Sequence, residues 1–145
     1  MVGAARSYRA LQIVLYALSL IEGLAGLALI FGSAWVMGFV VLPQTAAPAA
    51  GLFVLLFKAL GILALGLGYL LCVAARNPVR YVAIVDTFVF FLFAAGVLNI
   101  YADVALGAWA YFPSTYLLAR GILQILLGFV LLALRPRAVL QDAIE

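Results

Sequence analysis

Four long apolar stretches constrain the fold of this chain more than any other feature. They lie at about residues 10–32, 51–75, 81–101 and 115–134, and each is close to the roughly 20 residues that a helix needs to cross a bilayer. The strands of a membrane barrel would instead alternate over about 10 residues. With 70% hydrophobic and 9% charged residues, the chain of 145 residues also lacks the polar surface of a soluble domain. We therefore expect a single all-α domain, an integral membrane four-helix bundle.

The basic residues predict how the spans are oriented. Six of the eight flank the spans at three places, namely Arg6 and Arg9, Arg76 and Arg80, and Arg135 and Arg137. The two outer links, at about 33–50 and 102–114, contain no Lys or Arg. By the positive-inside rule, both termini and the middle link are cytoplasmic. The expected topology is two antiparallel helical hairpins in the inner (cytoplasmic) membrane.

Each span also carries one ionisable residue. Glu22, Lys58, Asp86 and Arg120 occupy the first to the fourth span in turn. A charge at the bilayer centre costs roughly 2.5 to 3.5 kcal/mol on insertion scales, so such residues pair or mark a site. At a rise of 1.5 Å per residue, Asp86 is only about 9 Å from Arg80, whereas the other three lie deeper. We expect Glu22 to meet Lys58 and Arg120, and Asp86 to pair with a cytoplasmic arginine.

Further polar side chains follow the helical spacing of these charges or lie near the outer end of the third span. The candidate polar cluster comprises Glu22, Lys58, Arg120, Gln124, Tyr16, Tyr69, Asn99 and Asp103. Two bases with one carboxylate leave a surplus positive charge, which suits an anionic ligand. The alternative is that these groups only bridge helices, each bond contributing on the order of 0.6 kcal/mol.

Residues for several kinds of chemistry are missing from the chain. The chain has no histidine, which is the commonest metal ligand. Cys72 is the sole cysteine, so an internal disulfide is excluded. We therefore assign no catalytic residue and no metal ligand. The sequence requires no cofactor, although a quinone or a lipid would suit the apolar spans. The net charge of +3 comes from no basic cluster larger than two arginines, so we expect no nucleic-acid partner.

The outer links are aromatic. Aromatic residues within or beside them are Trp35, Tyr101, Trp109, Tyr111, Phe112 and Tyr116. One interpretation is a belt at the membrane interface. The other is a lid over an outward-opening pocket, or a surface that docks a membrane protein. Small residues such as Gly61 and Gly68 offer a second contact face, within one chain or in a homo-oligomer.

Two local sequences suggest a family. Span two runs from Gly61 to Tyr69 into Ala75-Arg76-Asn77-Pro78-Val79-Arg80, and span four opens on Arg120-Gly121. Together with the chain length, these features resemble small bacterial four-span membrane proteins of the DoxX-like and BphX-like kind. The resemblance implies an accessory membrane protein, with quinone-linked redox systems for DoxX-like members and aromatic degradation clusters for BphX-like members. It carries over no catalytic residue.

Three functions are compatible with the sequence. The favoured one is an accessory or binding protein that holds a lipid-soluble or anionic small molecule, alone or as a subunit of a larger membrane complex. Lys58 and Arg120 would engage the ligand, and Glu22 would hold them in the empty site. A proton-coupled transporter acting as a dimer through Glu22 is an alternative, although two cations would repel a cationic substrate. The other alternative is a quinone- or lipid-linked enzyme, although the chain has few groups for acid–base catalysis.

Overall fold

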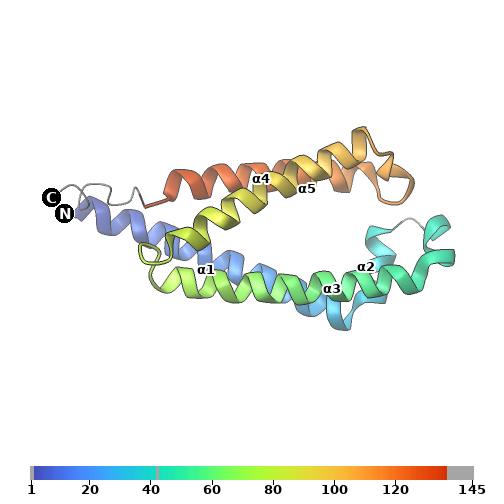
Figure 1. Cartoon of the computed structure of the whole chain (residues 1–145), viewed down its shortest axis with the longest axis horizontal. Helices are drawn as coiled ribbons and strands as arrows, with labels where there is room; N and C mark the ends of the chain where they lie inside the picture. Colours follow the sequence, from blue (N-terminus) through green and yellow to red (C-terminus); the bar gives the residue numbers. More distant parts are fainter. Residues whose placement is uncertain (1, 42, 137–145) are drawn as a thin grey trace.

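The computed structural model describes the backbone at residues 2–41 and 43–136, and the side chains there except at 2–7, 43–49 and 109. Within these ranges the chain is helical (Figure 1): α1 (Val2–Phe31), α2 (Ser33–Val40), α3 (Pro43–Arg76), α4 (Val82–Val104), the short 3-10 helix η1 (Ala108–Ala110) and α5 (Ser114–Leu134). Four helical segments are long and apolar enough to cross a membrane: Tyr8–Phe31, Ala50–Arg76, Val82–Val104 and Ser114–Leu134. The chain is thus an all-helical multi-pass membrane protein, as expected.

The four long helices associate as two pairs, α1 with α3 and α4 with α5. Glycines lie at both contacts. A Cβ atom added at Gly61 would lie 2.8 Å from the carbonyl oxygen of Gly26, and one added at Gly96 would lie 2.8 Å from that of Gly121. Small residues at these positions let the two backbones approach closely, which is how helices gain packing energy in lipid. Each pair is therefore a tight unit.

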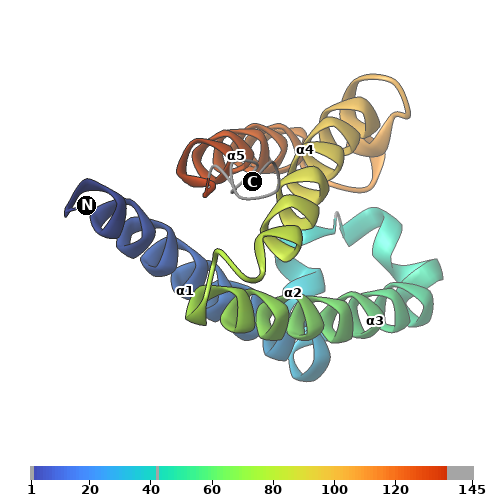
Figure 2. The same cartoon turned by 60° about the vertical axis from the view of Figure 1, so that its left-hand side comes forward.

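A short turn joins the two pairs. It follows Arg76, where Asn77 accepts a hydrogen bond at Oδ1 from the backbone N–H of Arg80, at 3.1 Å. Such side-chain bonds to the backbone stabilise a turn in place of further helix. Pro78 also disfavours continuation of α3. α4 begins directly after this turn and runs at an angle to α3 (Figure 2).

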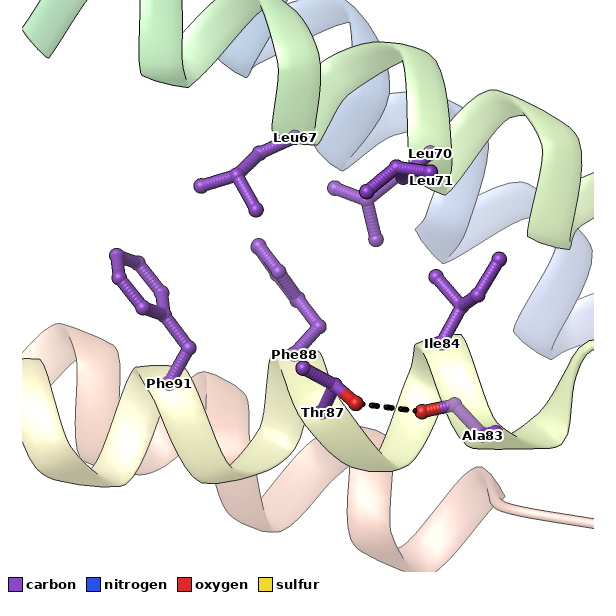
Figure 3. A pocket seen from close by; sticks show the side chains of 8 residues that line it. All are labelled: Leu67, Leu70, Leu71, Ala83, Ile84, Thr87, Phe88 and Phe91. Atoms are coloured by element: carbon purple, nitrogen blue, oxygen red, sulfur yellow. Dashed lines mark hydrogen bonds between the residues drawn. The ribbon is translucent and has the colours of Figure 1, made fainter.

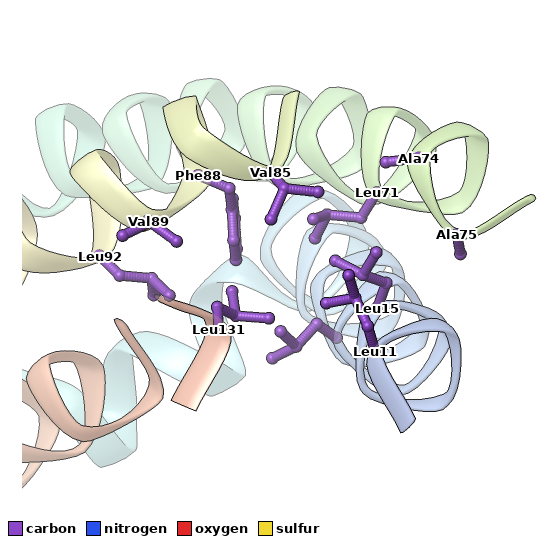
Figure 4. Close-up of a cluster of buried hydrophobic side chains, with 11 residues drawn as sticks. Leu11, Leu15, Leu71, Ala74, Ala75, Val85, Phe88, Val89, Leu92 and Leu131 are labelled. Carbon is purple, nitrogen blue, oxygen red and sulfur yellow. The ribbon is translucent and has the colours of Figure 1, made fainter. Parts of the chain in front are cut away.

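The two pairs share an apolar core at the end of the molecule that contains this turn. The side chains buried most completely come from all four long helices: Leu11, Leu15, Leu71, Val85 and Leu131. Figure 4 shows them converging between α1, α3, α4 and α5. Toward the opposite end the ribbons of the two pairs diverge (Figure 1).

The first outer link is more helical than the sequence indicated. We expected a link over about 33–50, but α2 occupies Ser33–Val40 and α3 already begins at Pro43. Proline suits the first position of a helix, and the alanines that follow it favour helix. The exposed Trp35 and Phe39 of α2 meet edge to face at 4.7 Å between ring centroids.

Candidate functional site

The helix faces that form the shared core become polar farther from the α3–α4 turn. On α1 the buried face includes Leu18, and Glu22 is the next residue along that face, where it is half-buried. On α5 the buried Leu131 is followed, toward the outer end, by Gln124 and Arg120 on the same face. An acid and a base from different helix pairs therefore lie beyond one apolar core.

Glu22 of α1 and Arg120 of α5 belong to different helix pairs and form no ion pair with each other. The one ion pair among the described side chains joins Arg135 to Asp86 and leaves Glu22 and Arg120 unpaired. The exposed Arg120 donates from Nη1 to the Tyr116 hydroxyl at 2.8 Å. A carboxylate of one pair and a guanidinium of the other thus lie beyond the core without forming an ion pair, and the region between them is here called the gap.

Two hydrogen bonds tie α4 to α5 beside this gap. Asn99 donates from Nδ2 to Gln124 Oε1 at 2.7 Å, and Ser114 donates from Oγ to Asp103 Oδ2 at 2.8 Å. Asp103 is only 8% exposed, and its Oδ1 has no hydrogen-bond partner among the described residues. The polar groups of Asn99, Gln124 and Asp103 therefore serve mainly to hold α4 against α5.

Lys58 does not join Glu22 and Arg120. The antiparallel register of α1 and α3 places Gly26 against Gly61, so Glu22 is level with residues near Leu65. Lys58 lies about two turns farther along α3, roughly 10 Å toward the outer end, and its side chain is exposed. The register of the α1–α3 pair therefore separates Lys58 from the level of Glu22.

The two predicted tyrosines lie on outer faces of the α1–α3 pair. Tyr69 is 69% exposed on α3. Tyr16 lines a shallow groove on α1 together with Ser19 and Gly23. The Ser19 hydroxyl donates across the pair to the carbonyl oxygen of Gly68 at 2.7 Å. The leucines of α1 and Glu22 therefore form its buried face, and Tyr16 lies outside that face.

Asp86 pairs with a basic residue near the α3–α4 turn, which confirms the expectation for it. Arg135 donates from Nη2 to Asp86 Oδ2 at 2.7 Å, and both side chains are partly exposed. The pair links α4 to the end of α5 at the core end of the molecule. Asp86 is therefore separate from the Glu22–Arg120 gap.

Aromatic side chains connect the two pairs at the outer end. Phe53 of α3 and Phe112, between η1 and α5, meet edge to face with ring centroids 6.4 Å apart. Tyr101 and Tyr111 are exposed, as an interfacial belt requires, and the side chain of Trp109 lies outside the described residues. The gap between Glu22 and Arg120 thus lies between an apolar core and an aromatic contact.

Sequence reasoning missed an apolar cavity between α3 and α4. Its volume is about 270 Å³ (Figure 3), and its lining residues are Leu67, Leu70, Leu71, Ala83, Ile84, Thr87, Phe88 and Phe91. No sequence signal could have revealed it, because these residues are ordinary for a membrane helix. The cavity results from the angle at which α4 leaves the turn.

The chain offers no metal centre in the part that the structure describes, where no three potential ligands come together. No protein-family model, curated protein or solved structure matches it. Its function is therefore inferred from the geometry of its own residues.

Proposed function

We propose that this protein is a small accessory membrane protein that binds a lipid-soluble or amphipathic small molecule between its two helix pairs, at the level of Glu22 and Arg120. The observation that carries the proposal is that an acid of one pair and a base of the other lie beyond the shared core, on the helix faces that form it, without an ion pair between them. Arg120 takes no part in the glycine contacts that hold each pair together, and Glu22 meets them only through its Cβ, which lies 3.5 Å from a Cβ added at Gly68.

The chemistry of the gap indicates what the ligand must offer. An arginine left without a counter-charge inside a bilayer is costly, and a carboxylate, phosphate or carbonyl oxygen would satisfy it through charge-assisted hydrogen bonds. Tyr116 accepts only one of the donors of Arg120, so several remain for a ligand. Glu22 is an acceptor for a ligand hydroxyl, because it forms no ion pair with Arg120.

The surroundings of the gap support a ligand that enters from the bilayer. Apolar side chains such as Leu18 and Leu131 lie on one side, and the Phe53–Phe112 contact lies on the other. Binding sites for small molecules are mostly apolar with a few placed polar groups. A quinone or a lipid-like acid has this combination, and the resemblance to DoxX-like proteins favours the quinone.

We also propose that the protein lies in the inner membrane with both termini and the α3–α4 turn facing the cytoplasm. The exposed Arg9, Arg76, Arg80 and Arg135 lie where α1 and α4 begin and α3 and α5 end, at one end of the molecule (Figure 1). The positive-inside rule assigns that end to the cytoplasm. Reporter fusions after the last helix should therefore be active as cytoplasmic reporters.

The ligand proposal is tested with Arg120→Gln. Native mass spectrometry of the wild-type protein, released from membranes in a mild detergent, should show a bound small molecule. Its occupancy should fall at least about tenfold in Arg120→Gln, which corresponds to about 1.4 kcal/mol of binding energy. Lys58→Gln is the matched control, since it also removes a base from a span but lies away from the gap.

Two outcomes would reject the proposal. One is an unchanged occupancy in Arg120→Gln at unchanged thermal stability. The other is equal loss in Arg120→Gln and Lys58→Gln. Uptake into proteoliposomes that is driven by a pH gradient and abolished by Glu22→Gln would instead support the dimeric transporter.

A further inference from the structure

We infer that the apolar cavity between α3 and α4 holds an acyl chain of an anionic phospholipid, whose head group is bound by Arg76 and Arg80. This lipid site uses α3 and α4, whereas the proposed ligand gap uses α1 and α5. The two sites share no residue, so each can fail without the other.

The cavity has a buried floor and an open rim. Leu71 and Phe88 form the floor and are 1% and 3% exposed, whereas Leu70 and Phe91 at the rim are 43% and 38% exposed. Figure 3 shows the side chains of the two helices facing one another across it. Since these faces lie within two apolar spans, the open side faces the hydrocarbon of the bilayer.

The cavity walls favour hydrocarbon over water. Thr87 is the one lining residue with a polar side chain, and its hydroxyl donates to the carbonyl oxygen of Ala83 at 2.8 Å. A buried water needs two to four polar partners, and these walls do not supply them. An empty void of about 270 Å³ would forfeit dispersion contacts along its whole lining. An acyl chain from the surrounding lipid supplies those contacts.

Two arginines at the end of the cavity select the charge of the lipid. Arg76 and Arg80 flank the α3–α4 turn and are exposed, and Arg76 lies about 8 Å along α3 from Leu71. Neither forms an ion pair with a described side chain, and Asp86, the acid near this end of α4, is paired with Arg135. Basic residues between spans at a membrane surface bind anionic head groups.

The experiment uses the full chain in nanodiscs made from equal amounts of phosphatidylcholine and phosphatidylglycerol. After transfer to mild detergent, native mass spectrometry counts the lipids that stay bound. We expect at least one lipid per chain, with phosphatidylglycerol enriched severalfold over the bulk ratio. Ala83→Phe should lower the bound lipid at least about fivefold, because the ring occupies the cavity from its rim. Ala94→Phe, on an exposed face of α4 outside the cavity, is the matched control and should change nothing.

A second variant separates the head group from the chain. The double variant Arg76→Gln, Arg80→Gln should still retain lipid but lose the preference for phosphatidylglycerol, whereas Arg9→Gln should keep it. The inference is overturned if the wild-type protein holds no lipid, if Ala83→Phe holds as much as Ala94→Phe, or if the preference survives the double variant. Arg120→Gln should leave the lipid count unchanged, which distinguishes this site from the proposed ligand gap.

Discussion

The contact inside each helix pair differs in kind from the contact between the pairs. Inside a pair, backbones approach so closely that a Cβ at Gly61 or Gly96 would lie 2.8 Å from a carbonyl oxygen of the neighbouring helix. Between the pairs, side chains meet in a core at one end and through Phe53 and Phe112 at the other. Lipid is as apolar as leucine, so helices in a membrane associate through close packing and hydrogen bonds.

This difference indicates where the molecule is rigid and where it can open. Inside each pair, small residues allow the backbones to pack closely, so enlarging one of them forces the helices apart. None of the close approaches at described glycines joins one pair to the other. A ligand that separates the pairs slightly would leave both glycine contacts intact.

The largest effect is expected inside a pair. Gly61→Val should lower the free energy of unfolding by about 1 to 3 kcal/mol, since the new side chain meets the α1 backbone and the helices must move apart. Gly66→Val, on the same helix, is the control, because a Cβ there meets nothing within 4 Å. Steric trapping in bicelles measures both values. Equal losses for the two variants would contradict the close-packing account.

A smaller effect is expected between the pairs. Phe53→Ala should cost about 0.5 to 1.5 kcal/mol, the range for an aromatic contact. It should also lengthen the distance between spin labels placed on the exposed Leu24 of α1 and Leu123 of α5, once Cys72 is replaced by serine. Double electron–electron resonance measures this distance.

The control for that change is Phe39→Ala. Phe39 meets Trp35 edge to face within α2, so its replacement should leave the distance between the pairs unchanged. An unchanged distance in Phe53→Ala would show that the core near the α3–α4 turn alone sets the separation of the pairs.

The smallest effect is expected for the polar link within the second pair. A double-mutant cycle over Asn99→Leu and Gln124→Leu should give a coupling energy of about 0.6 kcal/mol, and no more than about 1.7. The hydrogen bond of 2.7 Å adds to packing that Gly96 and Gly121 already provide. Unfolding in mixed micelles measures the cycle. A coupling of several kcal/mol would mean that this bond, and not the glycine contact, holds α4 to α5.

Several features of the fold could be predicted from the sequence because they depend on position along one helix. The four apolar lengths predict the spans, and the constant rise per residue predicts that Asp86 lies near the basic end, where it pairs with Arg135. The helical start of α3 at Pro43 was missed, since the segment before the apolar stretch carries no hydrophobic pattern. The cavity between α3 and α4 was missed because it depends on an angle between helices.

In the candidate site, too, the position of a residue along its helix could be predicted, whereas the alignment between helices could not. Gln124 and Arg120 were correctly placed on one face of α5, which is a matter of helical period. Lys58 was expected beside Glu22, but its depth relative to Glu22 depends on how α1 and α3 are aligned. That alignment is set by Gly26 against Gly61, and it puts Lys58 about 10 Å beyond Glu22.

From composition and spacing alone, this chain must form membrane-spanning helices that carry charges in costly places, because both properties depend on the transfer of each residue from water to lipid. Which charges face one another is a property of packing. The glycine contacts fix the register inside each pair, and the turn after Arg76 fixes how the pairs meet. Only together do they set Glu22 and Arg120 beyond one core and leave Lys58 apart.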